Sequence, residues 1–324
     1  MLISDWAIAM NLVAIALLGF IISAALLSGV WLLLSRFIDL FSTGSQKLVM
    51  WIWATGPWIL GLITMIVFSP IFEQTPMYAW ISEIAHWHHM YVFQLNSWHG
   101  LTVILFVVFS VVLLAIKGRQ LYWQSSAVQM MSAFSNSQQK NFGQQRVVVL
   151  DSDIPTAFTS GLFTPICYVS SGLINRLSDK ELDIVIQHEL AHVYNKDPLS
   201  KLLIAFLSAY YPKKLAHNLN AKFSLVTEYL ADQATVMKHS AEDIASTLVK
   251  VVRLQKATQA YKNNPALSYF SADNITQRVH RLLKPINRPI PLAIPVVSMF
   301  LLLCVTVSAV DATHHLIESI FIHS

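Results

Sequence analysis

The sequence predicts an α-helical membrane protein that carries one α+β domain between its third and fourth membrane spans. Hydrophobic residues make up 55% of the 324 residues and charged residues only 12%, about half the charge of an ordinary soluble protein. Four apolar segments approach or exceed the roughly 20 residues that a helix needs to cross a bilayer. The long interval between the last two segments, residues 117–288, contains all but Arg36 and Lys47 of the 22 basic residues.

The four apolar segments define the membrane part of the chain. They run from about Trp6 to Leu34, from Leu48 to Phe72, from Leu101 to Ile116 and from about Ile290 to Val310. The third is short, but Trp98, His99 and Gly100 can extend it into the interface. We therefore expect three membrane helices in residues 1–116, with an extracytoplasmic loop at about 73–98. A domain at 117–288 follows, and then a fourth helix with a short extracytoplasmic tail at 289–324.

The distribution of basic residues predicts the orientation. Residues 48–116 and 289–324 contain no Lys or Arg, and membrane proteins retain basic loops in the cytoplasm. We therefore expect a multi-pass membrane protein with both termini extracytoplasmic and residues 117–288 cytoplasmic. The isoelectric point near 9.0 has the same explanation, so no direct nucleic-acid partner is predicted and the lipid bilayer is the expected environment.

Local patterns predict the elements of the central domain. Val147–Leu150 and Ile166–Ser170 are short apolar runs rich in β-branched residues, as strands are. The polar stretch Gln120–Gln145 before them is typical of a connector. Ala157, Phe158, Thr159, Ser160 and Gly161 form an edge strand or a turn, and helical periodicity begins at Ser178.

One predicted helix carries a zinc-binding pattern. Ser178 and Glu181 form a capping box at its start. Within it, the sequence His188-Glu189-Leu190-Ala191-His192 places both imidazoles on one helical face, suited to two positions on a single Zn²⁺. The offset carboxylate of Glu189 can take the proton of an attacking water and pass it to the leaving amine.

A catalytic zinc needs a third protein ligand and an open position. Glu228 in the segment Thr227–Asp232 is the predicted third ligand, and Asp232 lies one helical turn later on the same face. Asp232 can accept the free N–H of a ligand histidine, which such sites require. The pattern therefore predicts one catalytic Zn²⁺ per chain in a zinc metalloendopeptidase.

Four residues are candidates for stabilising the oxyanion of the transition state, which zinc need not do alone. They are Arg278, His280, His217 and Tyr211. Sequence does not rank them, and for each one a structural role is the alternative.

The segment from about Val147 to Leu283 resembles the membrane metallopeptidases of the BlaR and MecR antirepressor type. The matching stretches are Ala157–Gly161, Tyr168–Leu173, His188–Asp197, Glu228–Asp232, Thr247–Val251 and Arg278–Leu283. The string Glu-Tyr-Leu-Ala-Asp also resembles the HtpX quality-control peptidases, a more distant relation. This resemblance implies a cytoplasmic α+β gluzincin-type metallopeptidase domain, with Ala157–Gly161 holding an extended substrate by β-augmentation.

The resemblance also implies a function. It suggests regulatory proteolysis of a cytoplasmic or membrane protein substrate, by analogy a cytoplasmic transcriptional repressor. HtpX-like quality control is the alternative, and a zinc-containing receptor that cleaves nothing is an alternative of another class, which Glu189 argues against. Antirepressor peptidases carry a penicillin-binding sensor domain after the last span, where this sequence has only Asp311–Ser324. We therefore expect no β-lactam sensing by that route. The oligomeric state stays open.

Seven histidines fall in segments expected outside the cytoplasm, namely His86, His88, His89, His99, His314, His315 and His323. A metal- or pH-responsive patch is one hypothesis, since imidazole binds transition metals and titrates near neutrality. The alternative is an interfacial helix that uses His and Trp at headgroup level. No pair in the dense segment His86–His89 has a ligand spacing of its own, which favours this alternative.

Overall fold

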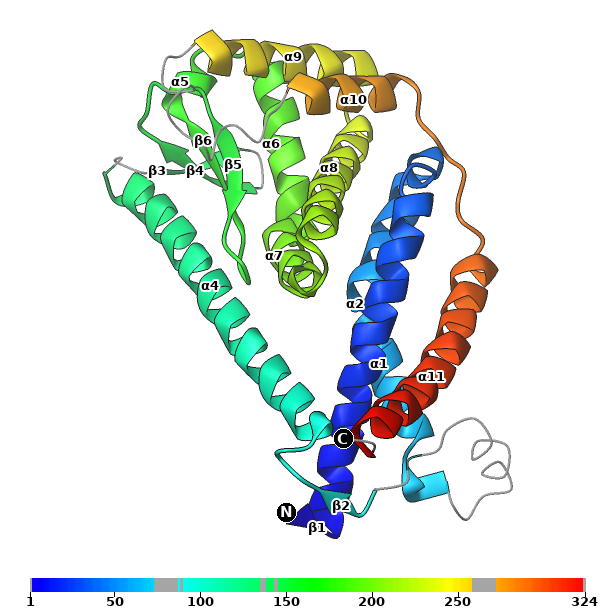
Figure 1. Cartoon of the computed structure of the whole chain (residues 1–324). Coiled ribbons are helices and arrows are strands. Elements are labelled where there is room, and N and C mark those ends of the chain that lie inside the picture. The colour runs from blue at the N-terminus through cyan, green and yellow to red at the C-terminus, as the bar shows by residue number, and fades with distance from the viewer. Residues whose placement is uncertain are drawn as a thin grey trace.

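The computed structural model describes residues 2–72, 87, 90–134, 138–142, 145–257 and 272–322. Its four longest helices are α1 (Asp5–Leu34), α2 (Thr43–Val67), α4 (Trp98–Phe134) and α11 (Ala293–Ile322). Each contains a stretch that is long and apolar enough to cross a membrane. The four predicted spans therefore coincide with helices that are long and apolar enough to be candidate membrane spans. Figure 1 shows them at the same end of the molecule as both chain termini, with the sheet and the shorter helices at the other end.

The spans are held together around α1. Gly61 of α2 lies against the backbone of α1, and a Cβ there would come within 2.5 Å of the Ala16 carbonyl oxygen. Asn11 of α1 donates from Nδ2 to the carbonyl oxygens of Met90 and Val92, 3.0 and 3.2 Å away. Val92 belongs to the short strand β2 (Val92–Phe93), which pairs with β1 (Leu2–Ile3). Two 3₁₀ turns, η1 (Ile38–Leu40) and η2 (Pro70–Phe72), follow α1 and α2.

A four-stranded sheet follows α4. Its strands are β3 (Gln138–Phe142), β4 (Gln145–Leu150), β5 (Ala157–Ser160) and β6 (Ile166–Ser170), in the order β3-β4-β6-β5. The two predicted strands, β4 and β6, are confirmed and pair in parallel. The predicted segment Ala157–Ser160 is a strand at the edge of the sheet, and Gly161 continues it in the left-handed region at φ 111°.

The connector predicted at Gln120–Gln145 is wrong. Instead α4 continues to Phe134 and the strand β3 follows. No glycine or proline interrupts residues 120–134, and Gln, Ala and Met favour helix, so the helix of the span is not stopped at the membrane boundary. The strand gains its stability from pairing with β4, where Gln138 lies opposite Val149, and a polar composition does not reveal that pairing.

The remaining elements are helical. They are α5 (Ser171–Ile174), α6 (Asp179–Tyr194), α7 (Asp197–Leu207), the 3₁₀ turn η3 (Ser208–Tyr210), α8 (Lys213–Val236), α9 (Ala241–Ala257) and α10 (Ala272–Leu283). The capping box of α6 is present: Ser178 Oγ accepts from the amide of Glu181, whose Oε2 accepts from the amide of Ser178 at 2.8 Å. Helix α6 buries Leu182, Ile186 and Leu190 against the sheet.

A second core joins the domain to the spans. It contains Leu27 of α1, Met50 of α2, Ile204 of α7 and Leu219 and Phe223 of α8, all no more than 1% exposed. One side of α8 is thus buried against the hairpin of α1 and α2, so α7 and α8 are not part of a separate globular domain.

Candidate metal centre

Two histidines of α6 face the same point beside α8. His188 and His192 are one helical turn apart, and their Nε2 atoms lie 3.3 Å from each other. Glu228 reaches the same point from α8. Its Oε2 lies 3.3 Å from His188 Nε2, and its Oε1 lies 3.5 Å from His192 Nε2.

These three donors fit a tetrahedral zinc. Zinc ligands at about 2.0–2.1 Å from the metal, in tetrahedral geometry, are about 3.3–3.4 Å from one another. The separation of 3.3 Å between the two Nε2 atoms matches that spacing, and so do the 3.3 and 3.5 Å from each Nε2 atom to an oxygen of the Glu228 carboxylate. Three protein ligands also leave one position open, as catalytic zinc requires.

The outer nitrogen of each imidazole is held by a buried carboxylate. His188 Nδ1 lies 3.0 Å from Asp232 Oδ1, and His192 Nδ1 lies 2.7 Å from Asp197 Oδ2. Asp232 and Asp197 are 2% and 1% exposed. Each carboxylate favours a proton on Nδ1, which leaves the lone pair of Nε2 free for a metal.

A tight reversal of the chain brings Asp197 back to α6. Helix α6 ends at Tyr194, and Lys196 adopts the left-handed conformation at φ 48°. Asp197 is the first residue of α7 and Pro198 follows it, a position that suits proline because its missing N–H would have no helical partner. The reversal therefore places the Asp197 side chain beside His192, five residues earlier in the sequence.

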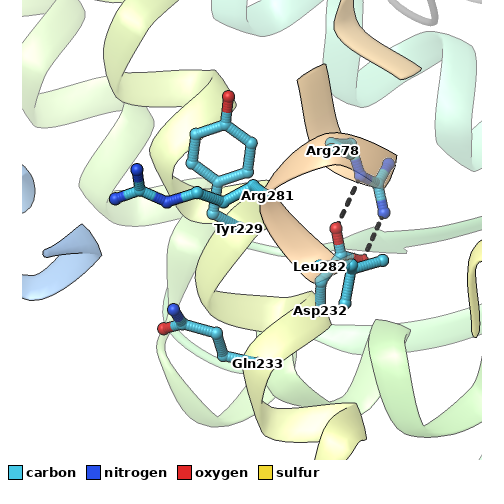
Figure 2. A pocket seen from close by; sticks show the side chains of 6 residues that line it. All are labelled: Tyr229, Asp232, Gln233, Arg278, Arg281 and Leu282. Carbon is cyan, nitrogen blue, oxygen red and sulfur yellow. Dashed lines mark hydrogen bonds and ion pairs between the residues drawn. The ribbon is translucent and has the colours of Figure 1, made fainter. Parts of the chain in front are cut away.

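Three cations surround the carboxylates. Arg278 of α10 makes a bidentate pair with Asp232, from Nε to Oδ2 at 2.9 Å and from Nη2 to Oδ1 at 2.7 Å, as Figure 2 shows. Its Nη1 lies 3.2 Å from Glu228 Oε2. Lys201 Nζ lies 3.3 Å from Glu228 Oε1, and Lys47 Nζ of α2 lies 3.6 Å from Asp197 Oδ1.

The electrostatics of this cluster favour positive charge between the two imidazoles. Burial opposes protonation of His192, but Glu228 and Asp197 outweigh it and raise the pKa of His192 to about 10. Burial likewise opposes protonation of His188, whose pKa is nevertheless raised by Asp232 and Glu228. Burial would raise the pKa of Asp232, yet the charge of Arg278 lowers it to about 2, so this carboxylate stays ionised at neutral pH. A divalent cation supplies the charge that the cluster favours.

Glu189 lies beside the edge strand. The hydroxyl of Thr159 in β5 is 2.9 Å from Glu189 Oε2 and 2.9 Å from its carbonyl oxygen, so it can donate to either. Glu189 is 8% exposed. The carboxylate is therefore oriented by the strand that the sequence analysis singled out for substrate binding.

The four candidates for oxyanion stabilisation are placed differently. Arg278 reaches the metal-ligand group, but its guanidinium is engaged by Asp232 and Glu228. Tyr211 is buried in the core shared with the spans and donates its hydroxyl proton to the carbonyl oxygen of Trp53. His217 and His280 have exposed side chains, and His280 is two positions from Arg278, which places it on another face of α10.

Sequence reasoning missed Asp197, Lys201 and Lys47 as members of this cluster, and it missed the contact of Thr159 with Glu189. For Asp197 a local signal exists, because an acidic residue before a proline at a helix start follows His192 by one short turn. Lys47 carries no such signal, since it comes from a membrane helix about 150 residues earlier in the sequence.

Together, four spans and a helix-borne group of two histidines and a glutamate define a membrane-embedded metallopeptidase. Residues 118–285, just over half of the chain, match the sequence profile of peptidase family M48. The chain belongs to this family of zinc-dependent metallopeptidases.

Comparisons with individual proteins give short matches. Protease HtpX of Wigglesworthia glossinidia brevipalpis is 34% identical over 70 residues, which cover 21% of this chain and 24% of the relative. Protease HtpX homolog 2 of Methanosarcina mazei is 35% identical over 66 residues, which cover 20% and 22%. The matches thus span about a quarter of the length of these relatives. The crystal structure of S. mikatae Ste24p gives a TM-score of 0.32 at 16% identity, over 69% of this chain and 63% of that one, a likeness too weak to carry an argument.

These comparisons change the ranking of the two family resemblances. They support a membrane metallopeptidase of family M48 and give HtpX proteins as relatives, whereas the BlaR and MecR subtype is not specifically supported. The HtpX resemblance, judged more distant from the motifs alone, is at least as well supported.

Proposed function

We propose that this protein is an HtpX-like, zinc-dependent endopeptidase that cleaves protein substrates at the membrane surface. The observation that carries the proposal is the group of His188, His192 and Glu228, whose donor atoms have the spacing of a tetrahedral zinc and lie beside Glu189. A purely structural zinc would not need a buried carboxylate with access to the reacting atoms, so a receptor that cleaves nothing is disfavoured.

The roles of the residues follow from their positions. His188, His192 and Glu228 would hold the metal, and Asp232 and Asp197 keep both imidazoles in the orientation that presents Nε2. Bound zinc would polarise the scissile carbonyl and make a neighbouring water more acidic. Glu189 accepts the proton of the attacking water and delivers it to the leaving amine nitrogen.

The edge strand β5 offers the substrate a backbone partner. It pairs with β6 on one side, and in the part of the chain that the structure describes no strand pairs with its other side. An extended substrate segment added there would lie next to Glu189, because Thr159 of the same strand contacts that carboxylate. Main-chain pairing of this kind tolerates many sequences, which suits an enzyme with a broad range of substrates.

The orientation of the protein is part of the proposal. The excess of Lys and Arg in residues 117–288 favours a cytoplasmic catalytic domain in a bacterial inner membrane, with both termini extracytoplasmic. The test is a reporter enzyme that works only in the cytoplasm, fused after residue 324. Activity of this fusion would contradict the proposed orientation.

Regulatory proteolysis of one partner, such as a cytoplasmic transcriptional repressor, is the second candidate. Three spans before the catalytic segment and one after it are the layout of the antirepressor peptidases, and the described helices have that arrangement. Selectivity separates the two candidates. A quality-control enzyme should cut many unfolded proteins, whereas an antirepressor peptidase should cut one partner at one site.

The proposal is tested with purified full-length protein in detergent. We expect about one catalytic zinc per chain and cleavage of an unfolded model protein by wild type. Glu189→Gln should retain this zinc and lose at least about a hundredfold in cleavage rate, the scale of a general base. Glu242→Gln, at an exposed position of α9, is the matched control and should cleave as wild type does. Loss of zinc in Glu189→Gln, or undiminished cleavage, would show that the role assigned to Glu189 is wrong.

A further inference from the structure

Two histidines and a glutamate gather at the end of the membrane bundle that lies far from α6. His99 is the second residue of α4, and His314 and Glu318 lie in the last turns of α11. Figure 1 shows the start of α4 and the end of α11 on the opposite side of the molecule from the metallopeptidase site. The ligand atoms of these three residues all lie within 4.8 Å of one another.

Both histidines are buried and framed by aromatic rings, and the Glu318 side chain is 17% exposed. His314 is 0% and His99 8% exposed. Trp87 stacks on the His314 ring at 4.0 Å between centroids and 17° between planes, and Trp98 lies against His99 at 3.8 Å. His314 Nε2 is 3.4 Å from Glu318 Oε1. The aromatic rings limit the rotamers of both imidazoles and restrict the access of water.

We propose that His99, His314 and Glu318 form a second metal site, which binds Zn²⁺ or a similar divalent first-row transition ion. Two imidazoles and one carboxylate are a donor set that such ions prefer, and the three ligands leave a fourth position for water. The separation of 3.4 Å between His314 and Glu318 is already that of neighbouring ligands on a tetrahedral zinc. The site is distinct from the catalytic one and shares no residue with it.

A local ion pair does not account for the whole arrangement. His314 and Glu318 are one turn apart, so their contact alone is an ordinary feature of a helix surface. His99, however, comes from another helix, and its ring centroid lies 5.6 Å from that of His314. Ionisable groups within a membrane span are costly and occur there mainly where they serve a function.

The site would tie together two helices that otherwise meet mainly through a third. Both α4 and α11 pack against α1, and Ile15 of α1, Val307 and Val310 of α11 and the partly buried Trp98 share one apolar cluster beside the site. A metal held by His99 and His314 would link α4 and α11 directly. His86, His88, His89 and His323 of the predicted histidine patch lie outside the described residues.

The test measures zinc binding by the full-length chain in lipid nanodiscs. In a background of His188→Ala and His192→Ala, which removes two ligands of the catalytic centre, we expect about one Zn²⁺ per chain. Adding Glu318→Gln or His314→Gln should weaken that binding by tenfold or more, since even loss of an outer partner of a ligand costs roughly 10–100-fold. His315→Gln is the matched control, because His315 is the neighbour of His314, its side chain is 45% exposed, and it lies beside Asp311.

Thermal unfolding gives an independent readout. Zinc should raise the melting temperature of the background protein and of its His315→Gln variant, but not that of the Glu318→Gln variant. Should the background protein not fold, the comparison is made in the wild-type chain, where Glu318→Gln should reduce bound zinc from about two ions to about one. A background that binds no zinc, or equal binding by the Glu318→Gln and His315→Gln variants, would overturn the proposal.

Discussion

Asp197 offers a sharp test of how the metal centre is built. The Asp197→Asn substitution keeps the shape of the side chain but removes its charge. In the wild-type chain Oδ2 lies 2.7 Å from His192 Nδ1, and the carboxylate is 1% exposed. Loss of such a carboxylate behind a ligand histidine typically costs 10–100-fold in metal affinity, which equals about 1.4–2.7 kcal/mol. We expect Asn at the lower end of this range, because its carbonyl oxygen can still accept from Nδ1, and Ala at the upper end.

Folding should survive this change. The other neighbour of Asp197 is Lys47 at 3.6 Å, whose side chain is 23% exposed and can turn to water once the carboxylate is lost. The variant protein should therefore differ from wild type in zinc affinity more than in secondary structure or expression.

The assay is a zinc competition titration against a chromophoric chelator, with full-length protein in detergent. Asp183→Asn is the control, because Asp183 lies on the same helix, has a side chain that is 50% exposed and pairs with His239 instead of a metal ligand. Excess zinc should restore most of the peptidase activity of Asp197→Asn. Zinc affinities within twofold of each other for wild type, Asp197→Asn and Asp183→Asn would refute the idea that Asp197 orients His192.

Three further predictions concern other parts of the site and its helix. Thr159→Val should lower the cleavage rate by about tenfold with zinc content unchanged, since a hydrogen bond to a charged group contributes about 1.5–3 kcal/mol. Thr159→Ser keeps the hydroxyl and should retain the wild-type rate. Steady-state kinetics of both variants would measure this difference. Arg278→Met should destabilise the protein by about 3–5 kcal/mol, because it leaves the buried carboxylate of Asp232 without its bidentate partner and also removes the ion pair with the partly buried Glu228. An unchanged denaturation midpoint would contradict this. Glu181→Gln, which can still complete the capping box, should cost about 0.5–1 kcal/mol, because it removes a negative charge from the first turn of α6 and the ion pair with Lys250. Hydrogen bonding from Lys250 lowers the pKa of Glu181 in the folded protein. The ionised carboxylate of Glu181 therefore stabilises the fold fully at pH values above the pKa that this group has in the unfolded chain. This stabilisation is lost as the pH falls through the lower pKa that Glu181 has in the folded protein. The difference in unfolding free energy between wild type and Glu181→Gln should therefore shrink as pH falls below about 4.

The parts of the site that sequence reasoning anticipated are those set by helical periodicity. The spacing of His188 and His192, and that of Glu228 and Asp232, places each pair on one face of a helix whatever the rest of the fold does. Likewise the spans follow from apolar length and the start of α6 follows from its capping box. These features are local, so a short window of residues contains the information that specifies them.

The parts that sequence reasoning missed depend on how distant segments pack. The contact of Asp197 with His192 requires the left-handed turn at Lys196, and the contact of Thr159 with Glu189 requires the sheet to lie against α6. Tyr211 shows the opposite error. The sequence makes Tyr211 one of four candidates for oxyanion stabilisation, but packing against α2 buries it in the shared core and directs its hydroxyl to Trp53. Neither the partner of a polar side chain nor its direction can be read from its own segment.

The metal centre is coupled to the membrane helices through charged contacts as well as through the shared core. Lys47 of α2 contacts Asp197, which holds His192. Arg281 of α10 donates to the carbonyl oxygens of Asp39 and Phe41 between α1 and α2, and Arg278 one turn earlier on the same helix holds Asp232. The two histidines proposed as metal ligands, His188 and His192, are therefore both oriented by carboxylates that are tied to one hairpin of the membrane bundle. A displacement of that hairpin would act first on the two imidazoles, while Glu189 would keep its contact with the sheet through Thr159. We therefore expect a displacement of this hairpin to change metal affinity more than it changes the position of Glu189.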